Sequence, residues 1–241
     1  MPDQVINTPA QARMLPYHEA EALLRRYDIP LAASRLVQSS EEAVAAAAEI
    51  GYPVALKAIS AQATHKSDAG LLHLGIAAEE TLAAAARQLL LRSNDLSRSQ
   101  VRSDDFSRSA LEGLLVQAMA PPGIEMIAGI SHDPQFGPVL ALGSGGILVE
   151  LLDDVALRLP PLSPAEARRM ITGTRAWPLL QGFRGRPPAD VDALADLMVN
   201  LSRLSQDNAQ RLLSLDLNPI IVLPRGEGVQ VVDLRVAVRQ P

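Results

Sequence analysis

An alanine-rich helix followed directly by an apolar strand most strongly limits the folds open to this chain. The segment SSEEAVAAAAEIG places Ser39 and Glu42 at the spacing of an N-terminal capping box, and Gly51 where a glycine commonly ends a helix. The next segment, YPVALKAIS (52–60), predicts a strand. Small alanine side chains suit close packing of a helix on a strand. The pair therefore predicts a sheet covered by helices.

The same alternation extends through the first half of the chain. Helices are predicted for YHEAEALLRRY (17–27) and AEETLAAAARQLLLR (78–92), with a short strand at the end of DIPLAASRLV (28–37). Residues 1–15 are expected to form a loose tail. Two near copies, SNDLSRSQ and SDDFSRSA, start ten residues apart, and they predict an exposed connector over 92–110.

The second half begins with two strand-like runs on either side of Pro121-Pro122-Gly123. A strand and a glycine-rich turn follow in FGPVLALGSGG. The helix SPAEARRMITG has Ser163 as its cap, Pro164 at its first position and Glu166 completing the box. An amphipathic helix (188–204) and a hairpin (214–238) end the chain. The fold class is therefore a mixed α+β.

Composition and charge exclude several kinds of site and partner. The chain has no cysteine, which excludes disulfides, thiolate catalysis and cysteine-type zinc sites. The net charge of −5, with no basic stripe, argues against nucleic acid as a partner. No apolar segment is long enough to span a membrane, and the N-terminus lacks the pattern of a secretory signal. A cytoplasmic protein is expected.

The C-terminal hairpin presents a candidate metal site. If its turn is centred between Arg225 and Gly226, Asn218 lies opposite Asp233, and Asp216 lies opposite Arg235 on the same face. Oxygen ligands of this kind suit Mg²⁺, which keeps several waters and binds few protein groups. The alternative is the solvated face of an edge hairpin with a cross-strand ion pair. Pro219 after Asn218 weakens that alternative, because proline removes a ladder donor in mid-strand.

Lys57 and the loop after its strand form a second candidate site. Lys57 shares a strand face with Ala55 and Ile59, so it lies either at a sheet edge or toward an anion such as phosphate. The loop THKSDAG contains His65, whose imidazole can accept a phosphoryl group. An ordinary solvated loop explains the same residues.

Further polar residues in the second half leave two interpretations open. The turn at Gly143–Gly146 can aim backbone amides at an anion, or it is simply a turn. Glu150, Asp153 and Asp154 are either ligands or surface charges. Arg158 lies in an apolar run and requires a carboxylate or a phosphate as its partner.

These segments together resemble the ATP-grasp subunit of the NDP-forming acyl-CoA synthetases, with succinyl-CoA synthetase beta subunits as more distant relatives. The resemblance rests on GYPVALKAIS, THKSDAG, the run from LVQAMAPPG to LPPL, and LDLNPIIV with VVDLRV, in this order. It extends from about residue 16 to residue 238. It implies an ATP-grasp fold with subdomains 16–115, including the exposed connector 92–110, and 116–241, which clasp a nucleotide.

The resemblance also implies roles for individual residues. Lys57 matches the lysine on the nucleotide phosphates, and His65 matches a phosphohistidine that relays a phosphoryl group to a partner subunit. The other positions fall into two groups. The cofactor-binding residues are Gln117 and Met119 at the adenine hinge, Glu125 near the ribose, and Arg158; the Mg²⁺ ligands are Asn218 and Asp233, with Asp216 beside them.

The implied activity is phosphoryl transfer between ATP and a histidine, in the reaction acid + CoA + ATP ⇌ acyl-CoA + ADP + phosphate. The cofactors are ATP/ADP and Mg²⁺, and the implied partner is a separate CoA-binding alpha-type subunit, since no Rossmann-like glycine fingerprint occurs here. Three positions depart from the family: Leu71 after Gly70, Leu234, and Ser144. Leu71 keeps open a non-catalytic nucleotide-binding subunit, and another ATP-grasp carboxylate ligase is a further alternative.

Overall fold

The computed structural model describes residues 12–60, 71–98, 111–146 and 154–240. They group into two units. Unit 1 contains Met1–Leu15, Glu19–Leu31 and Ala120–Pro241, and unit 2 contains Pro16–His18 and Ala32–Met119. The chain therefore passes between the units several times, and helix α1 (Tyr17–Arg25) lies mainly in unit 1.

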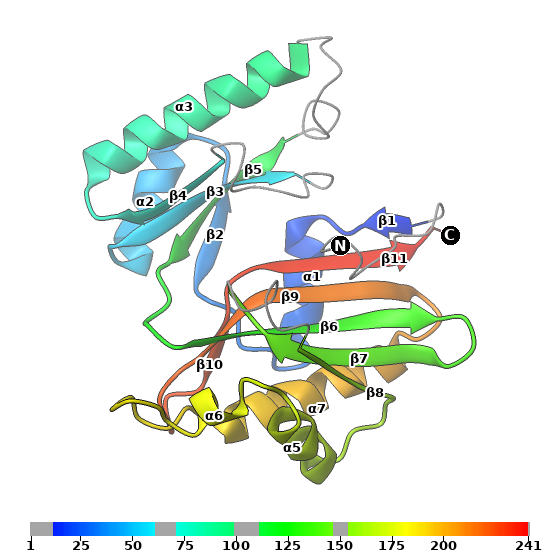
Figure 1. The fold of residues 1–241 in the computed structure, drawn as a ribbon. Helices are drawn as coiled ribbons and strands as arrows, with labels where there is room; N and C mark the ends of the chain where they lie inside the picture. Colours follow the sequence, from blue (N-terminus) through cyan, green and yellow to red (C-terminus); the bar gives the residue numbers. More distant parts are fainter. Residues whose placement is uncertain (1–11, 61–70, 99–110, 147–153, 241) are drawn as a thin grey trace. The chain divides into compact units, whose positions relative to one another are not determined.

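Unit 2 contains an antiparallel sheet with the strand order β2-β5-β3-β4 (Figure 1). Its strands are β2 (Ser34–Val37), β3 (Val54–Ser60), β4 (Leu72–Ile76) and β5 (Leu111–Ala118), and its helices are α2 (Ser40–Ile50) and α3 (Glu79–Arg98). The two central strands, β3 and β5, pair with each other along almost their whole length. A residue in the middle of β3 is therefore flanked by strands on both sides.

The predicted signals at both ends of α2 are present. The Ser39 hydroxyl accepts a hydrogen bond from the backbone N–H of Glu42 at 3.1 Å. The Glu42 carboxylate accepts from the backbone N–H of Gln38 at 2.8 Å, one residue before the expected partner. Gly51 ends the helix with a φ of 95°, a conformation that favours glycine.

The core of unit 2 lies between its sheet and the helices α2 and α3. Alternate residues of β3 and β5 contribute to it, together with alanines of both helices. The fully buried members include Val54, Leu56, Leu114, Val116, Ala43, Ala47, Leu82 and Ala86. Burial of these apolar side chains is the main contribution to the stability of the unit.

Unit 1 contains a larger antiparallel sheet, with the order β1-β11-β9-β6-β7-β8 and β10 paired to β9. Its strands are β1 (Ala12–Met14), β6 (Ile124–Asp133), β7 (Gly137–Ser144), β8 (Val155–Arg158), β9 (Leu212–Val222), β10 (Val229–Val231) and β11 (Leu234–Arg239). β9 lies inside the sheet, between β11 and β6, so the expected C-terminal hairpin is not an edge hairpin.

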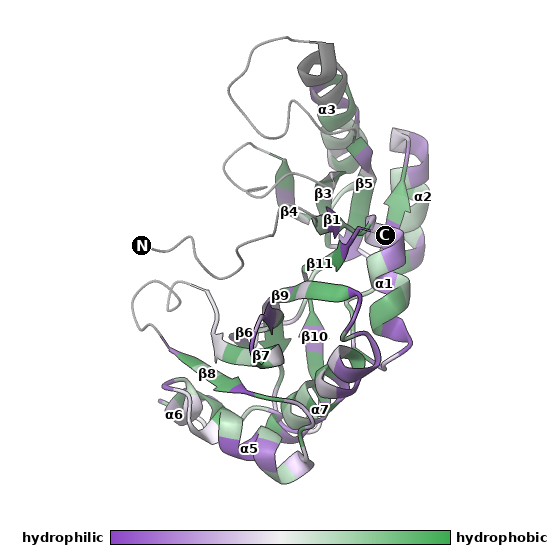
Figure 2. Ribbon diagram, turned by 90° about the vertical axis from the view of Figure 1, so that its right-hand side faces the viewer, coloured by the Kyte–Doolittle hydropathy of each residue, from purple (hydrophilic) through white to green (hydrophobic). Residues whose placement is uncertain are grey.

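Three further helices belong to unit 1: α5 (Pro164–Thr172), α6 (Trp177–Leu180) and α7 (Val191–Asp207). α7 packs against β6, β7 and β9, and α5 packs against α7. The capping box predicted at Ser163 and Glu166 is present. Figure 2 shows β9 in largely hydrophobic colours and α5 with hydrophilic segments, as expected for a helix at the surface.

Two segments differ from the sequence expectation. Ala12–Met14, expected in a loose tail, forms β1 and pairs with β11. Helix α3 continues to Arg98, into the expected connector. Pairing with a strand more than two hundred residues away is not encoded in the local pattern of residues 12–14. Among the described residues, no helix is long and apolar enough to cross a bilayer.

Candidate functional site

The pairing of β9 with β11 in unit 1 gathers the oxygen-bearing side chains of the C-terminal segment. Asp216 lies in register with Arg235, and the backbone N–H of Asn218 donates to the carbonyl of Asp233 at 3.2 Å. Val222 pairs with Val229, so the register is the one expected for a turn centred between Arg225 and Gly226. Asp216, Asn218 and Asp233 therefore share one face of the sheet.

The opposite face of the same strands is apolar. Leu215, Leu217 and Val236 are almost completely buried, while Asp216 and Asp233 are half-buried and Asn218 is exposed. The predicted separation into an apolar and a polar face is confirmed. Because β9 is an inner strand, its polar residues are not explained by the solvated edge of a sheet.

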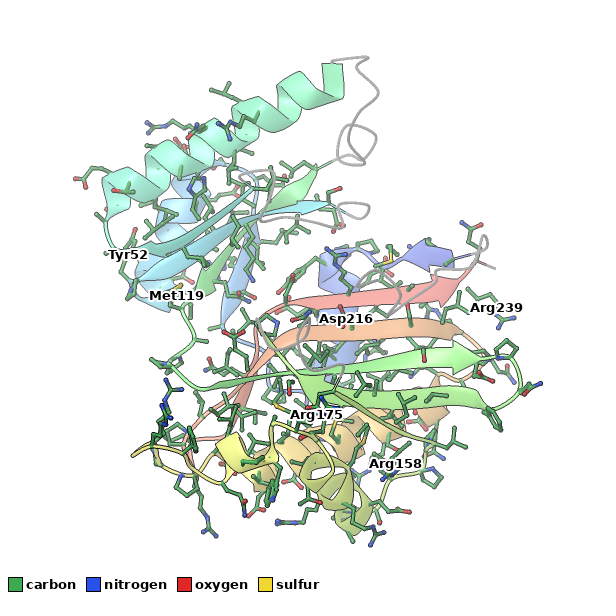
Figure 3. The ribbon with its side chains drawn as sticks, in the orientation of Figure 1. Tyr52, Met119, Arg158, Arg175, Asp216 and Arg239 are labelled. Atoms are coloured by element: carbon green, nitrogen blue, oxygen red, sulfur yellow. The ribbon has the colours of Figure 1, made fainter. Side chains whose placement is uncertain are left out.

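Asp216 has the most perturbed carboxyl group of this face. Burial raises its pKa to about 6, the Arg235 guanidinium lowers it, and the Asp233 carboxylate raises it further. Strongly perturbed pKa values cluster at functional sites, so Asp216 is a candidate functional residue. Figure 3 labels Asp216 on β9.

A small pocket of about 40 Å³ lies over this part of the sheet. Asp216 contributes to its wall, together with Ile127 and Gly129 of β6 and Val155 of β8. Gly129 lies in register with Asp216, so no side chain covers the carboxylate from that strand. Its volume is well below the roughly 300 to 1,000 Å³ of pockets that enclose a small-molecule ligand, so it leaves Asp216 accessible but does not by itself define a ligand site.

The chemistry of this donor set fits Mg²⁺. Two carboxylates and one amide oxygen are hard ligands, and Mg²⁺ commonly takes one or two carboxylates and keeps several waters. No group of three or more His, Cys, Asp or Glu side chains suited to a metal occurs in the described ranges. The oxygens of Asp216, Asn218 and Asp233 suit a metal that is also coordinated by waters or by phosphate oxygens.

Lys57 lies in the middle of β3 in unit 2, paired with Leu115 of β5 and with Leu72 of β4. The edge-strand interpretation of this lysine is therefore wrong. Lys57 is only 5% exposed, so it is not an ordinary surface lysine either. Lys57 lies on the sheet face opposite to the one that contributes Leu56 and Ala58 to the helix-covered core.

Gln117 shares the face of Lys57. It pairs with Ala55 of β3, two residues before Lys57, and is 2% exposed. Met119 follows at the last residue of unit 2 and is 36% exposed, with its backbone N–H donating to the carbonyl of Pro53 at 3.4 Å. Figure 3 shows Met119 close to Tyr52, both in unit 2. One face of this sheet thus carries an ammonium and an amide, and a thioether follows directly after β5.

Glu125 and Arg158 lie in unit 1 and are both exposed. Glu125 is at the start of β6, and its carbonyl accepts a hydrogen bond from the backbone N–H of Gly145 at 2.8 Å. Arg158 ends the edge strand β8 and donates to the carbonyl of Leu157 at 2.7 Å. This hydrogen bond is to a backbone carbonyl and not to a carboxylate.

The sequence left Asp154 as either a ligand or a surface charge, and the structure shows it as a hydrogen-bond acceptor within unit 1. It is half-buried, and it accepts hydrogen bonds from the Ser144 hydroxyl and from two backbone N–H groups before α6. In the sequence, the only sign of this contact is that Ser144 and Asp154 lie on either side of a largely apolar run. Only the pairing of β7 with β8 shows that they meet. His65 lies outside the described residues.

Comparison with known proteins places the chain in a family. The family model of the ATP-grasp domain matches residues 8–238. The chain belongs to the ATP-grasp family. It is 39% identical over 222 residues to "Acetate--CoA ligase [ADP-forming] II subunit beta" of Pyrococcus furiosus, an alignment that covers 92% of this chain and 90% of that protein. The ATP-grasp fold expected from the sequence is confirmed.

Other members of the ATP-grasp family are longer or have been solved with ligands. "Acetate--CoA ligase [ADP-forming] I" of Archaeoglobus fulgidus is 39% identical over 218 residues, which cover 90% of this chain and 30% of that protein. A structure of the Ca. Korarchaeum cryptofilum dinucleotide forming acetyl-coenzyme A synthetase 1 has a TM-score of 0.77 and 38% identity, covering 94% of this chain and 93% of that chain. It contains coenzyme A and Mg-AMPPCP, with its phosphohistidine segment pointing towards the nucleotide binding site.

Proposed function

We propose that this chain is the nucleotide-binding subunit of an ADP-forming acyl-CoA synthetase, working with ATP/ADP and Mg²⁺. The observation that carries the proposal is the 39% identity with a ligase beta subunit along 92% of this chain and 90% of that protein. The overall reaction is acid + CoA + ATP ⇌ acyl-CoA + ADP + phosphate.

The step assigned to this chain is phosphoryl transfer between ATP and His65. A ring nitrogen of His65 attacks the γ-phosphorus, the bond from that phosphorus to the β–γ bridging oxygen breaks, and ADP leaves. Phosphoryl transfer depends mainly on positioning and on electrostatic stabilisation of the phosphate oxygens. Lys57 offers a buried ammonium, which compensates phosphate charge more strongly than an exposed one.

Asn218 and Asp233 hold the metal, with Asp216 beside them. Mg²⁺ bound there neutralises charge on the β- and γ-phosphates during transfer. The adenine ring is assigned to Gln117 and Met119, the ribose to Glu125, and an anionic group of the nucleotide to Arg158. In this assignment residues 16–115 and 116–241 act as the two subdomains.

The partner is a CoA-binding alpha-type subunit. The Pyrococcus furiosus relative is itself a beta subunit, whereas the Archaeoglobus fulgidus relative is about three times as long, since this chain spans 30% of it. We therefore assign CoA binding and acyl transfer to a second chain, and a heteromer to the active enzyme. The chain by itself is expected to bind Mg·ATP and to make no acyl-CoA.

Acid-labile labelling tests the function. The purified full chain is incubated with γ-labelled ATP and Mg²⁺, and the acid-labile, base-stable phosphate on protein is counted. Label is expected on the wild type and on His73→Ala, a matched control on β4, and none on His65→Ala. Equal labelling of His65→Ala and of the wild type would contradict the assignment. Acyl-CoA formation by the single chain would contradict the two-subunit proposal.

A second candidate function is supported by Leu71. This residue is 2% exposed and packs in the core of unit 2, and its carbonyl accepts a hydrogen bond from the Ala58 backbone N–H at 2.9 Å. The chain is thus anchored directly after the His65 segment. A nucleotide-binding subunit without phosphoryl transfer would bind Mg·ATP but show no acid-labile label, with or without its partner.

A further inference from the structure

We propose that Asp154 and Ser144 are positioning residues that hold the Gly145–Gly146 turn against Glu125 and so fix the Glu125 carboxylate for hydrogen bonding to the ribose diol of the nucleotide. We call the Ser144–Asp154 pair the latch. All residues of this proposal lie in unit 1. It rests on the proposed function, because it assumes that a nucleotide is bound.

The latch is a partly buried, charge-assisted hydrogen bond. Ser144 is 2% exposed, and its hydroxyl donates to the Asp154 carboxylate at 2.6 Å. Ser144 is the last residue of β7, and Asp154 directly precedes β8. Gly143 pairs with Val155, so the two strands bring the serine and the aspartate together. Hydrogen bonds to an ionised acceptor are about twice as strong as neutral ones.

Asp154 is itself held in place by the backbone before α6. One carboxylate oxygen accepts from the backbone N–H of Arg175 at 2.8 Å, and the other accepts from that of Ala176 at 3.3 Å. Figure 3 labels Arg175. These two backbone donors hold the Asp154 carboxylate in place without Ser144. The Asp154 carboxylate therefore sets the position of the Ser144 hydroxyl.

The glycine turn lies in direct contact with Glu125. Ser144 pairs with Met126 across β6 and β7, and the next hydrogen bond runs from the Gly145 N–H to the Glu125 carbonyl at 2.8 Å. A Cβ at Gly145 would lie 2.8 Å from the Glu125 carbonyl carbon. A Cβ at Gly146 would lie 2.6 Å from Oε2 of Glu125. The two glycines thus form a surface on which the Glu125 backbone and carboxylate rest.

The chemistry of Glu125 selects the part of the nucleotide. Its carboxylate only accepts hydrogen bonds when ionised, and it repels phosphate. The ribose diol offers two adjacent hydroxyl donors, which match the two oxygens of one carboxylate. Such bonds discriminate only when the acceptor is held still, because a mobile side chain loses conformational entropy on binding. A fixed Glu125 therefore favours a ribonucleotide over an analogue without the diol.

The test compares binding of ATP and of 2′,3′-dideoxy-ATP to the full chain in saturating Mg²⁺, by calorimetry. The wild type is expected to prefer ATP, and Glu125→Ala to lose that preference. Ser144→Ala, which removes only the latch donor, is expected to lower the preference about tenfold while Mg·ATP still binds. The double variant Glu125→Ala/Ser144→Ala is expected to show no further loss, because the latch acts through Glu125.

Two matched controls separate positioning from general stability. Ser163→Ala removes a hydroxyl that caps α5 and is expected to leave the preference unchanged. Gly146→Ala puts a methyl group against Glu125 at a φ of 63° and is expected to lower the preference. Gly137→Ala has a comparable φ of 76° with no atom within 4 Å of the added methyl group, and is expected to keep it.

The possible outcomes separate this inference from the proposed function. If the wild type binds no Mg·ATP, the proposed function and the inference both fail. If Glu125→Ala loses the preference while Ser144→Ala and Gly146→Ala keep it, the latch does not position Glu125, and the proposed function stands. A wild type that binds both nucleotides equally would also overturn the inference.

Discussion

The backbone N–H of Asn218 donates to the carbonyl of Asp233 at 3.2 Å, which fixes the two proposed metal ligands opposite each other, Asn218 on β9 and Asp233 directly before β11. The β9–β11 ladder starts at the next pair, Leu217 and Leu234, and holds both ligands from that side. A site on rigid strands needs little reorganisation when its ligand binds.

Asp233→Asn is expected to raise the Mg²⁺ concentration for half-maximal ATP binding by at least about tenfold. Mutation of residues that only hydrogen-bond to metal ligands already lowers metal affinity by about 10- to 100-fold. The substitution keeps the shape of the side chain and removes the charge that attracts the cation. Titration of Mg²⁺ at fixed ATP measures it. Asp192→Asn, which removes a surface carboxylate paired with Arg168, is the control and should behave as the wild type.

Lys57→Met is expected to lower kcat/KM for phosphoryl transfer by about 10² to 10³, as the loss of one fixed donor to a developing charge does elsewhere. Methionine keeps the length and the apolar stem, so the buried position stays filled. Labelling rates at several ATP concentrations measure the loss. Arg35→Met, at an exposed arginine paired with Glu49, is the control. A change of less than twofold for Lys57→Met would show that the ammonium does not contact phosphate.

Asp190 is expected to make the stability of unit 1 depend on pH in the acid range. Burial opposes its charge, but backbone N–H groups of Ala193, Gly228 and Gly226 hydrogen-bond the carboxylate, and its pKa is lowered overall. A lowered pKa stabilises the folded state above the unfolded value of about 3.9, and this stability is lost as the pH falls through the lower folded pKa.

Asp190→Asn should therefore lose about 1 to 2 kcal/mol at pH 7, and its deficit relative to the wild type should shrink below about pH 4. Urea unfolding followed by circular dichroism at several pH values measures both. A deficit that stays constant from pH 7 to pH 3 would mean that the charge of Asp190 contributes nothing.

Leu56→Ala is expected to destabilise unit 2 by about 2 to 5 kcal/mol, because Leu56 is fully buried in the core against α2 and α3 and truncation leaves a cavity. Leu74→Ala makes the same chemical change in the same sheet at a residue that is 62% exposed, and it should cost less than about 0.5 kcal/mol. Thermal and urea unfolding of the two variants measure the difference. Equal losses of stability in the two variants would contradict the placement of Leu56 in the core of unit 2.

Local sequence patterns were enough to predict where several helices begin or end. The capping residues Ser39 and Ser163, with Gly51, marked helix ends that the structure contains, because capping depends on atoms within four residues. The pairing of Asp216 with Arg235 also followed from the sequence, since one turn position and a period of two fix the register of a hairpin.

Long-range pairing decided what the patterns left open. The sequence allowed Lys57 at an edge, and only the sheet order shows β3 between β5 and β4. It left Asp154 as a ligand or a surface charge, and only the pairing of β7 with β8 brings it to Ser144. The site residues of unit 2 and the residues near His65 stay assigned by resemblance.

The amino-acid sequence by itself determined the kinds of element, the register of the last hairpin and the side chains that alternate on its two faces, because these depend on neighbours along the chain. The tertiary structure alone decided that β9 lies inside its sheet, that Lys57 is buried, and that α1 lies mainly with the C-terminal unit. These depend on which distant strands pair, and that choice is made by the burial of the whole apolar surface and not by any single segment.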